Sequence, residues 1–202
     1  MRGLHCEASP PISAPMPRWD LDTVLNYLRS EQIEPMESAN LWHITMKTVF
    51  LMFVASGRRA NKLACLTRCF TGRSRLFLAW PASFRPKNYS LLQDNLRCLG
   101  RFGPSIPSIR MLDYRDPNNV LCPIRAYHHY LSRTTGPQFS KFYLWDHGDD
   151  KEKVNTPKLS RTFIKTVENA YPYANLSKPK PIGLHQARKL SASYGILLCN
   201  NL

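Results

Sequence analysis

The stretch Ser38–Gly57, which reads SANLWHITMKTVFLMFVASG, decides the fold of this chain. Leu41, Ile44 and Leu51 recur at the three- and four-residue spacing of a helix. Gly57 is a typical residue just beyond a helix C-terminus, because glycine adopts the left-handed conformation at little cost. We therefore predict one long helix that begins near Ser38 and ends at Gly57.

Shorter elements are predicted on both sides of this helix. Upstream, Asp20 is a good N-cap for a helix whose apolar face contains Leu21, Val24, Leu25 and Leu28. Downstream, we predict four helices: one at Arg59–Leu66, one opened by Pro123, one from Thr156 and a last one from Leu184. Between them we predict a strand at Leu76–Trp80, a hairpin turn at Ser83–Asn88, a short strand at Ile106–Met111 and an extended piece at Phe142–Trp145. The predicted fold class is mainly α with a small antiparallel β-sheet.

The domain organisation follows from length and composition. The chain has 202 residues, which is enough for one domain with a sizeable core. Residues 1–17 are rich in Pro and Ser and are predicted to be a flexible leader or linker. Residues 18–202 then form the single domain.

The charge of the chain points to a polyanionic partner. Lys and Arg number 28 against 14 Asp and Glu, a formal net charge of +14. Residues 57–101 contain ten basic side chains and one acid, Asp94. Nucleic acid is the polyanion that such a surface most often binds. A membrane is not expected, because the longest apolar run, Thr48–Ala55, is far below the roughly 20 residues that span a bilayer.

The cysteines indicate neither a metal site nor a disulfide framework. The six cysteines include no Cys-x-x-Cys pair. Without a recognisable signal peptide, we expect reduced thiols in an intracellular compartment. No metal and no cofactor are expected.

Four polar residues have the chemistry to hold a phosphodiester. His185 and Arg188 are three positions apart on a predicted helix and therefore share a face. Arg59 follows the Gly57 turn, and Lys87 lies in a predicted turn from which a long amine could act as a general acid. The planar arginine fork can grip two phosphate oxygens at once.

The chain resembles the catalytic domain of tyrosine recombinases, the phage-integrase-type enzymes, and most closely those of DIRS-type retrotransposons and Cryptons. The resemblance covers roughly residues 18–198. It is carried by WDLDTVL from Trp19, KTVFLMFVASGRRANKLACL from Lys47, FRPK from Phe84, LCPIRAY from Leu121 and HQARKLSAS from His185.

The resemblance implies that Arg59, Lys87, His185 and Arg188 surround a scissile phosphate. In the family a tyrosine attacks that phosphate, which leaves a 3′-phosphotyrosyl bond, so that DNA strands are recombined or integrated without a cofactor. It further implies a nuclear protein of a mobile element that binds double-stranded DNA and forms a homo-oligomer on it. From charge alone, we expect Arg58, Arg73, Arg75 and Arg85 to contact neighbouring phosphates.

Three departures from the family pattern leave the activity open. Lys62 stands where the family has an acid three residues after the first arginine, and Arg58 competes with Arg59 for that position, although we favour Arg59. Tyr194 is the tyrosine that follows Arg188, and its expected role is a packed aromatic. We therefore expect a C-terminally truncated domain without its nucleophile: a fragment, a degraded copy or a domain that borrows a tyrosine. The alternatives are a DNA-binding module without catalysis and, more weakly, a basic RNA-binding protein.

Overall fold

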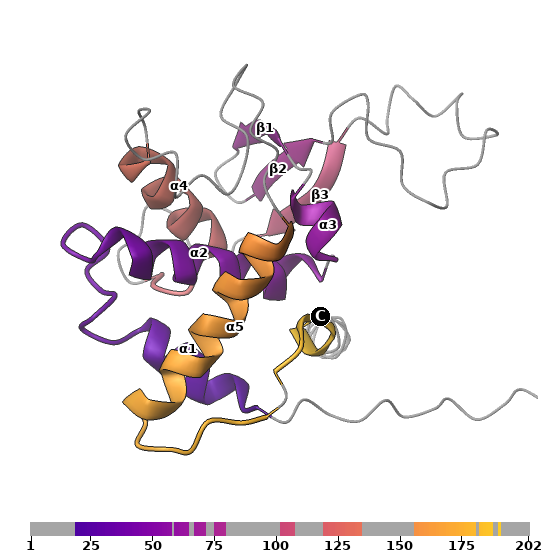
Figure 1. The fold of residues 1–202 in the computed structure, drawn as a ribbon. Helices are drawn as coiled ribbons and strands as arrows, with labels where there is room; N and C mark the ends of the chain where they lie inside the picture. The colour runs from indigo at the N-terminus through magenta and orange to yellow at the C-terminus, as the bar shows by residue number, and fades with distance from the viewer. Residues whose placement is uncertain are drawn as a thin grey trace, which may run out of the picture.

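The computed structural model describes residues 19–57, 59–64, 67–71, 75–79, 102–107, 119–134, 156–180, 182–187 and 190, with the strands described by their backbone. The elements in chain order are α1 (Leu21–Leu28), α2 (Leu41–Ser56), α3 (Ala60–Ala64), β1 (Thr67–Thr71), β2 (Arg75–Ala79), β3 (Phe102–Pro107), α4 (Pro123–Arg133) and α5 (Thr156–Tyr173). Figure 1 shows α2 in the middle of these helices, with α5 crossing it.

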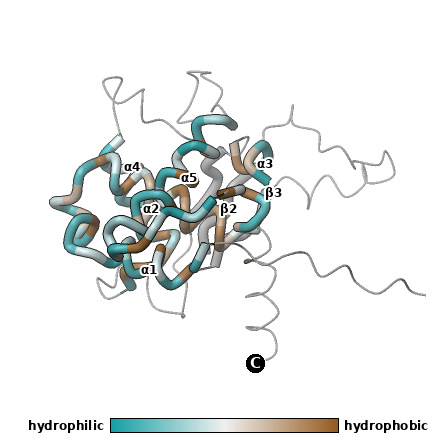
Figure 2. Tube along the Cα trace, turned by 60° about the horizontal axis from the view of Figure 1, so that its bottom comes forward, coloured by the Kyte–Doolittle hydropathy of each residue, from teal (hydrophilic) through white to brown (hydrophobic). Residues whose placement is uncertain are grey.

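Helix α2 is the centre of the hydrophobic core. It begins after Asn40, whose side chain accepts a hydrogen bond from the amide of Trp42, and it ends at Gly57, which has a φ of 59°. Its side chains from Ile44 to Phe53 are all buried. A helix that is apolar on every side needs neighbours on every side, and α4 and α5 both pack against it. In Figure 2 the outer turns around this core are largely hydrophilic.

Aromatic rings join α5 to α2 and to the start of α1. Phe163 of α5 stacks on Phe50 of α2 with ring centroids 5.2 Å apart, and it meets Phe53 edge-on at 5.4 Å. Trp19 packs edge-on against both Phe50 and Phe163. The hydroxyl of Tyr171 accepts a hydrogen bond of 2.7 Å from the amide of Asp20, which ties the end of α5 to the start of α1.

Helix α4 closes the opposite side of α2. Pro123 occupies its first turn, where the missing N–H costs nothing. Thr48 of α2 donates a hydrogen bond of 3.0 Å to the carbonyl of Ala126, a buried contact between the two helices. All residues of α4 from Pro123 to Tyr127 are buried, so the first half of α4 belongs to the core.

The predicted fold class, an α+β domain like that of the tyrosine recombinases, is wrong for the described core. Every buried side chain that the structure describes comes from a helix or from a connection between helices, and the strands are described by their backbone alone. The backbones of β1, β2 and β3 pair in antiparallel order, but each strand has only five or six residues. Strand β3 contains two prolines, which cannot donate to a ladder, and it is an edge strand. The physical reason for the error is that the described interior is built by α2, which is buried from Ile44 to Phe53, and by the helices α4 and α5 that pack against it.

Several predicted helices are confirmed, with shifted ends. The helices capped by Asp20 and opened by Pro123 and Thr156 are present, and residues 184–187 are helical. The long helix begins at Leu41 rather than near Ser38, because residues 36–38 form a turn and Asn40 is the N-cap. The predicted leader, the turn at Ser83–Asn88 and the piece at Phe142–Trp145 lie outside the described residues.

Candidate nucleic-acid interface

Arg59 lies at the surface, at the junction of α2 and α3. The left-handed turn at Gly57 ends α2, where the amide of Gly57 donates to the carbonyl of Phe53 over 3.0 Å. The carbonyl of Arg59 accepts a 3.0 Å hydrogen bond from the amide of Leu63, which begins the short helix α3. The side chain of Arg59 is exposed. The junction therefore presents a guanidinium group to solvent, as a phosphate contact requires.

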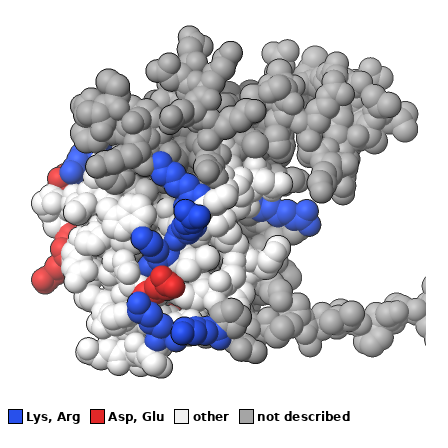
Figure 3. Space-filling view, in the orientation of Figure 1, with Lys and Arg blue, Asp and Glu red and all other residues white. Residues whose placement is uncertain are grey.

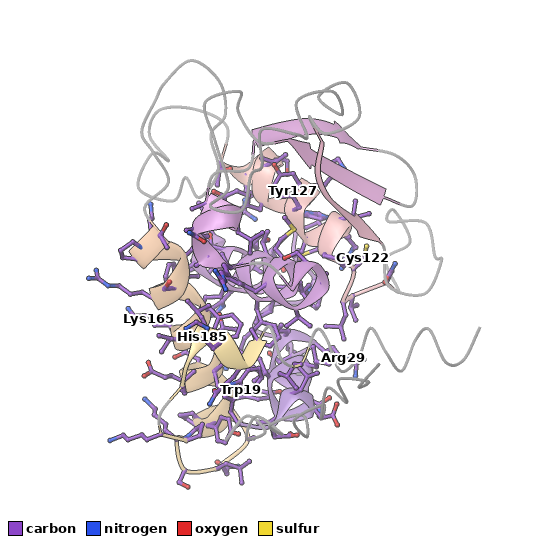
Figure 4. The ribbon with its side chains drawn as sticks, turned by 90° about the vertical axis from the view of Figure 1, so that its right-hand side faces the viewer. Trp19, Arg29, Cys122, Tyr127, Lys165 and His185 are labelled. Atoms are coloured by element: carbon purple, nitrogen blue, oxygen red, sulfur yellow. The ribbon has the colours of Figure 1, made fainter. Side chains whose placement is uncertain are left out.

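His185 is also exposed, on the helical turn formed by residues 184–187 (Figure 4). On the other side of the same turn Ala187 is buried, and so is Leu190 further along. Gln186 closes the start of the turn, since its side-chain oxygen accepts from the amide of Gly183. The turn is thus anchored by its apolar side and presents the imidazole to solvent.

The predicted four-residue site is only partly within the described residues. Lys87 and Arg188 lie outside them, as do Arg58, Arg73 and Arg85, and Arg75 begins β2 but its side chain is not described. Within the described residues, no hydrogen bond or ion pair joins Arg59 to His185. The convergence of the four residues on one phosphate therefore stays a prediction.

The exposed face of α5 carries a basic pair that sequence reasoning missed. Arg161 and Lys165 are exposed and lie one helical turn apart, opposite the buried residues Leu159, Phe163 and Val167. The ammonium of Lys165 lies 5.6 Å from the ring centroid of Trp42 on α2. The sequence could have shown this pair, because charges at this helical spacing lie on the side of the helix opposite its apolar residues.

This basic pair lies near the element that carries Arg59. Helix α3 packs against α5, and Figure 1 shows it beside the start of α5. After α5, the exposed residues Lys178 and Lys180 continue the run of positive charge. Figure 3 shows Lys and Arg side chains down this side of the molecule, with an acidic side chain among them. Like charges one turn apart destabilise a helix by a few tenths of a kcal/mol, and a bound anion would offset this repulsion.

A second charged constellation is buried and holds the connection between α1 and α2. We call residues 29–40 the strap. Glu34 of the strap accepts hydrogen bonds from Lys47 of α2 and from both terminal nitrogens of Arg125, at 3.0 and 3.3 Å. Lys47 is fully buried and also donates to the carbonyl of Leu28 over 2.9 Å. Burial lowers the pKa of Lys47 to about 8, although Glu34 opposes that shift.

Two other residues of α4 follow Arg125 along the same side and also contact the strap. His129 Nε2 lies 3.2 Å from the Glu37 carboxylate. Arg133 donates to the carbonyls of Met36, Glu37 and Ala39. Because every one of these contacts joins elements of the core to each other, this constellation fixes the architecture and does not present a ligand site.

Metal and membrane sites are not found in the part of the chain that the structure describes. There, no group of three or more His, Cys, Asp or Glu side chains could hold a metal ion. No helix among the described residues combines the length and hydrophobicity needed to cross a bilayer.

Comparison with known proteins gives no relative. The chain matches no protein-family model, no curated protein and no solved structure. The likeness to tyrosine recombinases therefore rests on the residues quoted above and remains an interpretation of the sequence.

Proposed function

We propose that this protein binds double-stranded DNA through the basic side formed by Arg59 and the exposed face of α5. The observation that carries the proposal is the pair Arg161 and Lys165, which is exposed, has no ion-pair partner among the described residues and lies on the helix against which α3 packs. A net charge of +14 supplies the long-range attraction that such contacts need.

The salt dependence of binding tests this proposal. Each phosphate contact contributes about 0.9 to the slope of log affinity against log salt concentration on duplex DNA. We expect Arg161→Gln with Lys165→Gln to reduce that slope by about 1.8, measured by fluorescence anisotropy between about 50 and about 200 mM salt. Arg29→Gln is the single-charge control for the removal of a cation elsewhere, because Arg29 is exposed after α1, at the start of the acidic strap. Equal slopes for the double variant and the control would place the contacts elsewhere.

We further propose DNA strand recombination or integration as the chemistry of the complete site, on the strength of the recombinase resemblance. Arg59, Lys87, His185 and Arg188 would then surround the phosphate, with the two arginines neutralising the charge that develops on it. The exposure of Arg59 and His185 supports this assignment, since both are open to a DNA ligand.

The competing proposal is a recombinase-derived module that binds DNA without cutting it. Lys62 favours it, because a cation three residues after Arg59 repels that arginine where the family has a supporting acid. Nicked suicide substrates separate the two. A covalent protein–DNA adduct on a denaturing gel that is lost in Arg59→Ala supports catalysis, whereas salt-sensitive binding without any adduct supports the binding module.

A further inference from the structure

A short segment after α5 carries two exposed lysines on either side of a proline. We call residues 177–180, which read SKPK, the basic arm. Lys178 and Lys180 are exposed, whereas Pro179 between them is half-buried. Neither lysine has an ion-pair partner among the described residues, and the sequence from Tyr171 to Leu202 contains no acid. The arm therefore presents two uncompensated positive charges.

The arm is held at both of its ends. Before it, the chain leaves α5 through Asn175, whose φ of 57° is left-handed. The amide of Leu176 donates back to a carbonyl of α5 over 2.8 Å, which completes a helix-ending turn. After the arm, the amide of Gly183 donates to the side-chain oxygen of Gln186 over 3.3 Å. The arm thus connects two hydrogen-bonded turns and joins α5 to the helical turn that presents His185 (Figure 1).

Proline restricts the backbone of the arm. The ring of Pro179 fixes its own φ near about −65°. Lys178 and Lys180 each precede a proline in the sequence, and such residues are confined to extended conformations. In an extended chain, the Cα atoms of residues two positions apart are separated by roughly 6–7 Å. Successive phosphates along one strand of nucleic acid have a similar separation, so the two lysines are spaced to meet neighbouring phosphates.

The arm lies apart from the basic pair of α5. Lys165 lies about two helical turns before the end of α5 at Tyr173, which is roughly 12 Å along the helix axis. Arg161 lies one turn further away. The major groove of duplex DNA is also about 12 Å wide. The basic pair and the arm can therefore reach different phosphates, and their contributions to binding should add.

Two acids of α1 lie near this end of α5, and their charge is partly compensated. The amide of Asp20 donates to the hydroxyl of Tyr171, and Asp22 lies in the first turn of α1. The carboxylate of Asp20 accepts from the amide and the hydroxyl of Thr23, at 2.7 and 2.6 Å. Both acids lie at the positive end of the α1 dipole, which offsets part of their charge. They therefore weaken the attraction of the arm for phosphate less than free carboxylates would.

We propose that the basic arm binds two successive phosphates of one DNA strand, one phosphate at each lysine. This inference rests on the DNA binding proposed above, and it adds a contact to a single strand beside the turn that carries His185. Each ammonium group offers three donors to the phosphate oxygens. Because proline already restricts the arm, little backbone entropy is lost when the phosphates bind.

Removing the two charges tests this contact. Lys178→Gln with Lys180→Gln should reduce the slope of log affinity against log salt concentration by about 1.8 on a duplex, because each phosphate contributes about 0.9. On a single strand of the same length the reduction should be about 1.4, because each phosphate contributes about 0.7 there. Fluorescence anisotropy of labelled DNA between about 50 and about 200 mM salt measures both slopes. Lys178→Arg with Lys180→Arg is the matched control, since it keeps both charges and should retain the wild-type slopes.

Loosening the backbone tests the restriction of the arm. Pro179→Gly keeps both lysines but frees the chain between them. The salt slope should remain that of the wild-type protein, because the number of neutralised phosphates is unchanged. The affinity at low salt should fall about 2-fold to 5-fold, because the arm then loses more conformational freedom on binding.

The possible results separate this inference from the function proposed above. An unchanged slope in the lysine-to-glutamine double variant, with a reduced slope in Arg161→Gln with Lys165→Gln, overturns the arm contact and leaves the α5 contact. The reverse result supports the arm contact and overturns the α5 contact. A slope that falls on the duplex but not on the single strand overturns the assignment of both lysines to one strand. An unchanged affinity in Pro179→Gly overturns the restriction of the arm, and wild-type protein that binds neither form of DNA overturns both proposals.

Discussion

Glu34→Gln removes the single negative charge that two buried cations share. The carboxylate is 13% exposed and binds Lys47 through one oxygen and Arg125 through both. Glutamine has almost the same shape, so the change is electrostatic rather than steric. Its amide nitrogen, however, can only donate, and one of the two arginine nitrogens then faces another donor.

The expected loss of stability is about 3 kcal/mol at neutral pH. Removing one partner of a buried ion pair costs about 3–5 kcal/mol, because the other charge is left without compensation. The low end applies here, since the glutamine oxygen still accepts one hydrogen bond and the site is not fully closed to water. For a chain of this size about 2–4 °C of Tm accompany each kcal/mol, so Tm should fall by roughly 6–12 °C.

The loss of stability should also depend on pH, whereas the loss caused by a simple packing defect should not. Burial already lowers the pKa of Lys47 to about 8, and Glu34 is the group that opposes the shift. Above that pH Lys47 is neutral in the wild-type protein, so the carboxylate has less to stabilise. The penalty of Glu34→Gln should therefore be smaller at about pH 9 than at about pH 6.

Urea unfolding followed by circular dichroism and by tryptophan fluorescence measures this penalty. Glu31→Gln is the control, because Glu31 is an exposed acid on the same strap. A double variant, Glu34→Gln with Lys47→Met, should be more stable than Glu34→Gln alone, since it also removes one of the uncompensated cations. If Glu34→Gln and Glu31→Gln unfold within about 0.5 kcal/mol of each other, the buried network does not hold the strap.

Two further predictions concern α2. Gly57→Ala places a Cβ at a φ of 59° and should cost about 1 kcal/mol in urea unfolding, whereas Gly183→Ala, where a Cβ would meet nothing within 4 Å, should be nearly neutral. Because the folded pKa of Lys47 is about 8 against an ordinary value of 10.5, the unfolded chain binds more protons between these values. The contribution of Lys47 to the free energy of unfolding should therefore rise with pH in that window, and Lys47→Met should remove the rise. If the rise persists in Lys47→Met, another group causes it.

The helices could be predicted because their signals are local. Asp20, Gly57 and Pro123 mark helix ends within one turn of the residues they act on, and the apolar spacing of α5 is complete within its own sequence. The fold class could not be predicted in the same way. The fold class depends on long-range packing, namely on whether the short strands contribute to the core. The described side chains of the core belong to helices and their connections.

The candidate site was predictable only in part, for a related reason. The exposure of Arg59 follows from its place after a glycine turn. The network around Glu34 joins residues 13 and 91 positions away, so no window of sequence contains it. Its one local signal is Lys47, a lysine in a helix that is otherwise apolar or hydroxylated through its middle.

The distribution of acids gives the proposed DNA complex an orientation. Among the described residues, five of the six acids lie between Asp20 and Glu37, on α1 and the strap, and the sixth is Glu168 on α5. Arg59, which belongs to the basic segment of the sequence, follows the other end of α2. A duplex is attracted to the basic side and repelled by the acids of α1 and the strap, so encounters should be steered before any contact forms.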